Sequence, residues 1–116
     1  MVYEKGMERD MILEAINSYD VYNTATKSVL KSLVTIYSEQ EKVSKISINA
    51  LADLSKLSKQ GVYNALKYIE KDNTVERFKK SGERVTYFKL NQTKLSEICE
   101  YHNKLEISKS ILSKEK

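Results

Sequence analysis

The sequence predicts a mostly α-helical chain with one small β-hairpin. The 116 residues include no proline and only three glycines, so the chain has few places to turn, which favours long helices over a many-stranded sheet. Apolar residues recur at spacings of three and four through most of the chain. Two β-like runs enclose Ser81 and Gly82, and glycine at the second position of a tight loop suits a hairpin.

Composition predicts one globular domain over residues 1–116. Hydrophobic residues make up 41% of the chain and charged residues 31%, which is enough apolar surface for a single packed core. A membrane helix needs about 20 apolar residues in a row, and charged side chains interrupt this sequence too often for that. Acidic residues near the start do not resemble a secretory signal, and Cys99 has no second cysteine to pair with, so we expect a cytoplasmic protein.

The basic charge is concentrated in one segment. Residues 56–89 hold nine basic and four acidic residues, whereas the rest of the chain is nearly neutral. This asymmetry is expected where one surface faces a polyanion. A lysine-rich face that is simply solvated explains the charge alone equally well.

The first two helices are predicted from their apolar stripes. Residues 3–19 carry one stripe on an otherwise charged segment. A second helix follows the polar Asn23, with Thr24 or Thr26 as its N-cap, and ends before the polar run 38–45.

Two short helices joined by a turn of about three residues come next, in the helix-turn-helix arrangement. Ser47 caps the first, whose apolar side is formed by Ile48, Leu51, Ala52 and Leu54. Ser58 caps the second, over 58–71. Its buried stripe is predicted to be Val62, Ala65, Leu66 and Ile69, with Lys59, Gln60, Tyr63, Asn64 and Lys67 facing outward. Asn73 stands where this helix must stop, since asparagine tolerates the left-handed conformation.

The hairpin is predicted over 75–90 with Ser81 and Gly82 as its loop. This register pairs Phe78 with Val85 and sets Lys79 opposite Arg84. Like charges directly opposite each other are destabilising unless an anion lies between them, although both side chains could also splay into water.

A last helix is predicted over 93–112, with Thr93 as its cap. Its seam has heptad spacing: Leu95, Ile98, His102, Leu105, Lys109 and Leu112. We expect it to pack on helix 3–19 of the same or a partner chain. We expect the scattered tyrosines, among them Tyr19, Tyr37, Tyr68 and Tyr101, to be mostly packing residues.

The run 46–71 resembles the helix-turn-helix of prokaryotic winged-helix DNA-binding proteins, and with its neighbours the resemblance covers 24–90. The matching features are Leu51-Ala52, Leu57-Ser58, Val62, Ala65-Leu66 and Ile69-Glu70-Lys71, followed by Val75-Glu76-Arg77 and the basic hairpin. Asn73 replaces a common glycine, and Gly61 occupies an inward position that is usually serine or threonine. Glycine there costs about 1 kcal/mol of helix propensity, which close approach of another backbone would justify.

The resemblance implies a winged helix-turn-helix flanked by N- and C-terminal helices that could join a dimer. Helix 58–71 would then enter the major groove, where the amides of Gln60 and Asn64 suit adenine and Tyr63 suits a thymine methyl. The remaining contacts implied, mostly to phosphates, are Ser47, Lys56, Ser58, Lys59, Lys67, Lys79, Lys80 and Arg84.

The resulting functional hypothesis is sequence-specific binding of double-stranded DNA by a homodimeric transcriptional repressor that reads a pseudo-palindrome. Two alternatives are an origin-binding replication or plasmid-maintenance protein and a winged-helix protein-interaction module. An enzyme is not favoured: Cys99, His102 and Glu106 are close in sequence but match no catalytic or four-ligand metal pattern, and no cofactor is expected.

Overall fold

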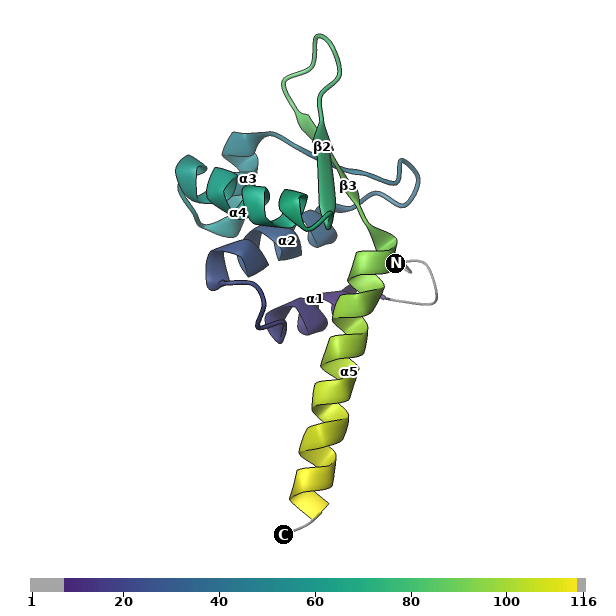
Figure 1. Cartoon of the computed structure of the whole chain (residues 1–116). Helices are drawn as coiled ribbons and strands as arrows, with labels where there is room; N and C mark the ends of the chain where they lie inside the picture. Colours follow the sequence, from purple (N-terminus) through teal and green to yellow (C-terminus); the bar gives the residue numbers. More distant parts are fainter. Residues whose placement is uncertain (1–7, 115–116) are drawn as a thin grey trace.

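The computed structural model describes residues 8–114, with side chains described up to residue 108. The elements in chain order are α1 (Arg9–Asn17), α2 (Thr24–Ile36), β1 (Ser44–Ile46), α3 (Ile48–Ser55), α4 (Lys59–Lys71), β2 (Val75–Phe78), β3 (Thr86–Leu90) and α5 (Gln92–Lys114). The hairpin of β2 and β3 projects from one end of the molecule and the last part of α5 from the other, over a long dimension of 60 Å (Figure 1). The mostly α-helical class with a small hairpin is confirmed.

One hydrophobic core joins all five helices and the sheet. Helix α2 lies at its centre, packed between α1, α3 and α4, and Phe88 from β3 is the largest fully buried side chain. The predicted stripe of α4, made of Val62, Ala65, Leu66 and Ile69, is buried as expected. Among the described residues, no helix combines the length and the apolar character needed to cross a membrane.

The apolar side of α3 differs from the prediction at one position. Leu54 is 47% exposed, whereas Ser55 beside it is buried and its hydroxyl lies 3.0 Å from that of Ser32 on α2. Helical spacing explains this, because position 55 continues the face of Leu51 and Ala52. The buried serine is tolerated since it has a hydrogen-bond partner.

Side-chain caps begin four of the helices. Ser47 Oγ accepts from the Ala50 amide and Ser58 Oγ from the Gly61 amide, which confirms both predicted caps. The predicted caps of α2 and α5 were wrong. Asn23 caps α2 and Asn91 caps α5, because each asparagine side chain accepts a hydrogen bond from the amide three residues on.

Both helices of the helix-turn-helix end at a left-handed residue. Asn73 has φ 65°, as predicted, and Lys56 has φ 59°. After α4, the Thr74 amide donates to Ile69 O and the Asn73 amide to Glu70 O, the paired bonds of a Schellman motif. The same pair of bonds follows α3, so the turn between the helices is fixed by its own backbone.

The sheet has three antiparallel strands in the order β1-β3-β2. Strand β1 was not predicted, because three residues are too few to show an alternating pattern. The predicted hairpin register was wrong by two residues: Phe78 lies opposite Tyr87 rather than Val85, and the loop spans 79–85. Gly82, with φ 81°, sits in a turn inside this longer loop, where the Glu83 amide donates to Lys80 O.

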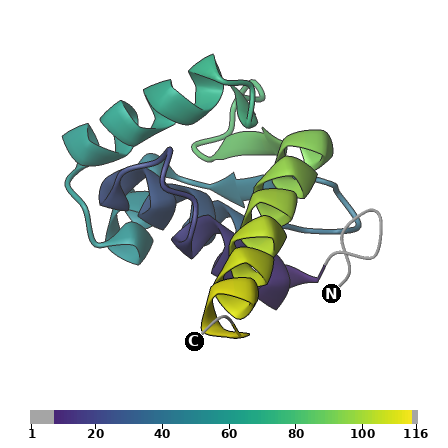
Figure 2. The same cartoon turned by 60° about the horizontal axis from the view of Figure 1, so that its bottom comes forward.

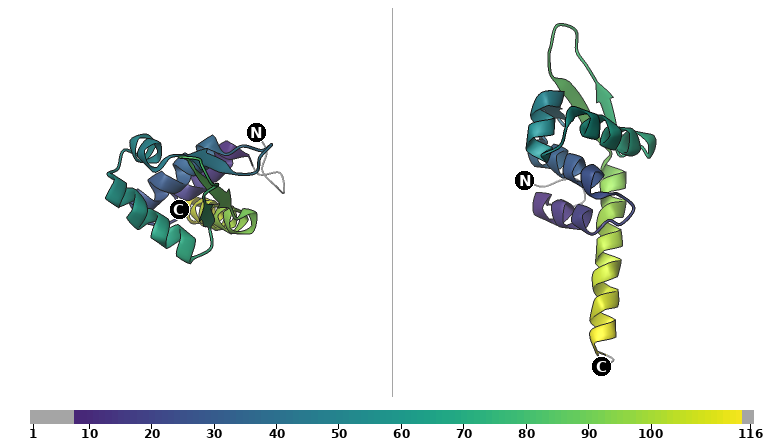
Figure 3. Two further views of the ribbon diagram at one scale, coloured as in Figure 1. Left: turned by 90° about the horizontal axis from the view of Figure 1, so that it is seen from above. Right: turned by 90° about the vertical axis from the view of Figure 1, so that its left-hand side faces the viewer.

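Helix α5 packs on α1 through its first half, and Figure 2 shows α5 passing in front of α1. Leu95 and Ile98 are fully buried, whereas His102 and Leu105 are partly exposed. Helix α1 begins at Arg9 and ends at Asn17, so it is shorter than predicted at its end, and the predicted residues 3–7 lie outside the described part. The side chains of Lys109 and Leu112 also lie outside it. Beyond the α1 contact, α5 extends away from the core (Figure 3).

We expect Asn73→Ala to lower the free energy of unfolding by about 1 kcal/mol, because alanine pays the full cost of the left-handed conformation. Asn73→Gly should keep or raise stability. Chemical unfolding measures both, and Asn103→Ala at an exposed helical position of α5 is the matched control. An Asn73→Ala variant as stable as the control would contradict the role of this residue.

Candidate nucleic-acid interface

Helix α4 turns a polar face to solvent. Lys59, Gln60, Tyr63, Asn64 and Lys67 are all exposed, as predicted. Gln60 Nε2 donates to Asn64 Oδ1 at 2.9 Å, which joins the two amides into one unit. This bond leaves the carbonyl oxygen of Gln60 as a further acceptor and the amino group of Asn64 as a further donor on the exposed face.

A cleft of about 190 Å³ brings α3, α4 and the hairpin together. This hairpin cleft is lined by Ser47, Ile48, Asn49, Lys59, Tyr63, Lys79, Arg84 and Thr86. Five of the eleven predicted contact residues therefore meet at one place. Asn49 was missed; its exposed position in the first turn of α3 was the available signal.

The hairpin cleft concentrates positive charge that has no local counterion. Within residues 8–108, Lys59, Lys79 and Arg84 form no ion pair. The prediction that Lys79 and Arg84 pair across the hairpin ladder was wrong, because both lie in the longer loop. The two side chains nevertheless line the same cleft. Three unpaired cations around one hollow repel one another, so an anion bound there would stabilise the arrangement.

Other predicted contacts lie elsewhere. Lys56 lines a hollow between α1, α2 and α3, together with Asn17 and Lys31. Lys80 lies over the Tyr87 ring, with Nζ 4.6 Å from its centroid. Asn64 and Lys67 line a groove on the flank of α4 that faces α2. Ser58 Oγ is engaged in its cap.

Gly61 does not serve a close backbone approach, the one reason that the sequence offered for a glycine at this position. A Cβ added there would meet Ser58 Oγ at 3.3 Å and Leu57 Cβ at 3.5 Å, and both atoms belong to the turn before the helix. Glycine at this position thus gives room to the capping serine.

Comparison with known proteins finds similar solved structures but no similar sequence family. No protein-family model matches the sequence, and no curated protein matches it. The crystal structure of MepR, a transcription regulator of the Staphylococcus aureus multidrug efflux pump MepA, superposes with a TM-score of 0.52 at 17% identity and covers 90% of this chain and 76% of that one. A MepR variant bound to an oligodeoxyribonucleotide gives a TM-score of 0.55 at 16% identity, covering 90% and 73%. RV1404 from Mycobacterium tuberculosis gives 0.51 at 11%, covering 90% and 69%.

The chain has the winged-helix fold. The hairpin of β2 and β3 is the wing, and α3 and α4 form the helix-turn-helix. The resemblance found in the sequence is thereby confirmed for the fold.

The wing is built on an aromatic pair. The rings of Phe78 and Tyr87 stack with centroids 5.2 Å apart and an interplanar angle of 19°. Glu83 accepts a hydrogen bond from the Tyr87 hydroxyl at 2.5 Å, and this bond, assisted by burial, raises the pKa of Tyr87 to about 12. Glu83 is the only acidic residue in the loop 79–85, where it faces three basic residues, so the wing loop keeps a net positive charge.

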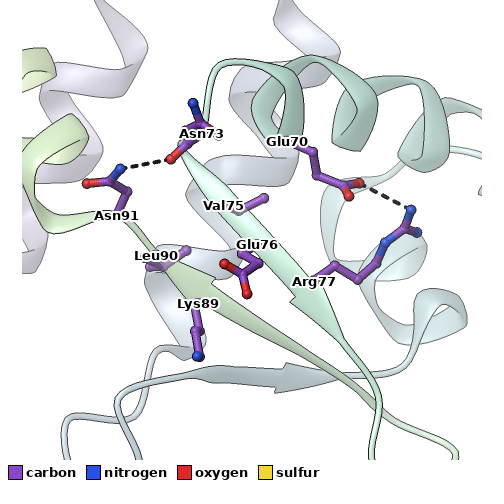
Figure 4. Close-up of a pocket in the computed structure, with 8 residues that line it drawn as sticks. All are labelled: Glu70, Asn73, Val75, Glu76, Arg77, Lys89, Leu90 and Asn91. Carbon is purple, nitrogen blue, oxygen red and sulfur yellow. Dashed lines mark hydrogen bonds and ion pairs between the residues drawn. The ribbon is translucent and has the colours of Figure 1, made fainter.

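Arg77 ties the wing to α4. Its guanidinium lies 3.2 Å from Glu70 Oε1 (Figure 4) and 5.8 Å from the Tyr63 ring centroid. Sequence reasoning assigned Arg77 no role, because the link joins a helix and a strand across a turn. The surrounding pocket of about 460 Å³ also holds Glu76 and Lys89, and its mixed charge does not suit a polyanion.

Cys99 and His102 on α5 are part of the packing of this helix: Cys99 is buried and His102 contacts α1. The His102 ring contacts α1, with Nδ1 3.2 Å from Ser18 Oγ and Nε2 3.8 Å from Glu14 Oε1. Burial raises the pKa of the Cys99 thiol. In the part of the chain that the structure describes, no three or more histidine, cysteine, aspartate or glutamate side chains gather as metal ligands.

We expect the Tyr87–Glu83 bond to make stability sensitive to alkaline pH. The pKa of Tyr87 is raised above its ordinary value of 10.0, so the neutral phenol favours the folded state. That contribution is present below about pH 10 and is lost as the pH rises towards 12. Urea unfolding at a series of pH values should show a smaller loss for Tyr87→Phe than for the unaltered protein, and equal losses would refute this role of the bond.

Proposed function

We propose that this protein binds double-stranded DNA sequence-specifically, as a homodimeric transcriptional regulator that acts as a repressor in the cytoplasm. The observation that carries the proposal is the hairpin cleft, where three unpaired cations adjoin the amide-bearing face of α4. A polyanion with readable base edges matches both features together.

Each part of the interface has a separate role in this proposal. The joined amides of Gln60 and Asn64 present one acceptor and one donor, the pattern that an adenine edge in the major groove requires. Lys59, Lys79 and Arg84 neutralise phosphates next to that groove and give affinity without sequence preference. Ser47 and Asn49 are within the same cleft and can donate further hydrogen bonds to phosphate.

We propose that the dimer forms through α1 and the part of α5 that extends beyond its contact with α1. Helix α5 continues to Lys114 beyond the core, and Ile107 on it is 59% exposed. A two-fold axis there would place two copies of α4 about 34 Å apart, in successive major grooves of a pseudo-palindrome. Repression would then be steric, because the bound dimer occupies DNA that polymerase needs. The MepR variant bound to an oligodeoxyribonucleotide is a precedent for DNA binding by a protein with this fold.

The direct test is selection of bound duplexes from a random double-stranded library at about 150 mM salt, where base contacts must supply affinity. We expect an enriched inverted repeat. Absence of any enriched sequence would contradict the proposal and favour a protein-interaction role for the fold.

The selected duplex separates base contacts from phosphate contacts. Asn64→Ala should cost about 1–3 kcal/mol on the selected site and relax preference at one base pair of each half-site. Lys79→Ala should weaken binding to all sequences alike and reduce its salt dependence. Fluorescence anisotropy on matched and mutated duplexes measures both, and identical behaviour of the two variants would contradict the assigned roles.

Oligomeric state is tested independently by light scattering of the protein at micromolar concentration. A dimer is the expected result. A monomer that still binds the selected half-site would remove the two-fold arrangement and leave DNA binding standing.

A further inference from the structure

A second groove lies along α4, on the flank opposite to the hairpin cleft. This α2-side groove has a volume of about 450 Å³ and is lined by Asn23, Asn64, Lys67, Tyr68 and Lys71. Only Asn64 and Lys67 were assigned roles from the sequence. The other three residues belong to no function described so far.

The α2-side groove is electropositive because two lysines and no acidic residue line it. Within residues 8–108, the ammonium groups of Lys67 and Lys71 form no ion pair. Glu70 is engaged by Arg77 on the other flank of α4. Asp72 accepts hydrogen bonds from Tyr22 and Thr74, and Lys94 lies 4.0 Å from it. No acidic residue lines the groove.

Tyr68 is the unexpected member of this groove. It was predicted to be a packing residue, but it is 61% exposed, whereas Tyr22, Tyr37 and Tyr87 are buried. Its position follows from helix geometry, since about 100° per residue sets it beyond the edge of the buried stripe. The exposed Tyr68 hydroxyl can donate a hydrogen bond to an anion that Lys67 and Lys71 also attract.

The two flanks of α4 match the two edges of a DNA major groove. A helix with its side chains is about 10–12 Å across, and the major groove is about 12 Å wide, so an inserted helix has one phosphodiester backbone on each side. Lys59 and Tyr63 lie on the flank of the hairpin cleft, and Lys71 and Tyr68 on the other. The hairpin cleft can reach only one of those backbones.

We propose that the α2-side groove binds the phosphodiester backbone of the DNA strand opposite to the one held at the hairpin cleft, with Lys67, Lys71 and the Tyr68 hydroxyl as its contacts. This inference rests on the proposed DNA binding and adds a second backbone site to it. Held between two backbones, α4 has a fixed depth and tilt, which the amides of Gln60 and Asn64 need in order to meet one base pair.

The test uses the full chain and the selected duplex carrying neutral methylphosphonates at single positions of either strand. Lys71→Gln should lose sensitivity to methylphosphonates along one edge of the major groove and keep it along the other, and Lys79→Gln should show the reverse. Removal of one lysine–phosphate ion pair should also reduce the slope of log affinity against log salt by about 0.9. Tyr68→Phe keeps the ring and should weaken binding about threefold, as removal of one modest hydrogen bond does.

Lys42→Gln in the loop between α2 and β1 is the matched control, since it removes the same charge from an exposed position outside α4, the wing and the helices proposed for the dimer. The inference is overturned if Lys71→Gln and Tyr68→Phe bind as tightly as this control, or if Lys71→Gln responds to methylphosphonates like the unaltered protein. Failure of the unaltered protein to select any duplex is a different result, and it would overturn the proposed function itself.

Discussion

Burial of one face of α4 against α2 and the sheet determines the surface chemistry of this protein. The four buried side chains of α4 are at most 2% exposed: Val62, Ala65, Leu66 and Ile69. This burial fixes the rotation of the helix about its axis. Once that rotation is fixed, the remaining positions divide into a middle that faces solvent and two flanks. The exposed amides, the hairpin cleft and the α2-side groove all follow from it.

The C-terminal end of α4 is fixed by backbone and side-chain hydrogen bonds. A Schellman motif closes the helix at Asn73, and Asp72 joins hydrogen bonds from Tyr22 and Thr74. These contacts connect the end of α4 to the start of α2, and Lys94 connects it to α5. Burial and the bond to Asp72 raise the pKa of Tyr22. Displacement of α5 would therefore be transmitted to α4 through polar contacts as well as through the core.

Several features that depend on neighbours in sequence could be predicted, although the caps Asn23 and Asn91 were missed. Features that depend on distant neighbours could not. The cap at Ser58 and the left-handed Asn73 involve bonds over a few residues, and the exposed face of α4 follows from its periodicity. The hairpin register could not be chosen, because a shift of two residues keeps every side chain on the same face of the sheet. The stacking of Phe78 on Tyr87 selects the register, and it exists only in the folded sheet. Exposure of Tyr68, by contrast, was missed although it follows from the periodicity of α4, because about 100° per residue sets it beyond the edge of the buried stripe.

The hydrogen bond between Gln60 and Asn64 has an evolutionary consequence. Each amide fixes the orientation of the other, so a replacement at either position changes which groups both residues present. Substitutions at the two sites should therefore be strongly epistatic, with single changes losing recognition and only selected pairs restoring it. Under the proposed function, a lineage of such proteins would move to a new target sequence by paired replacements rather than by gradual single steps.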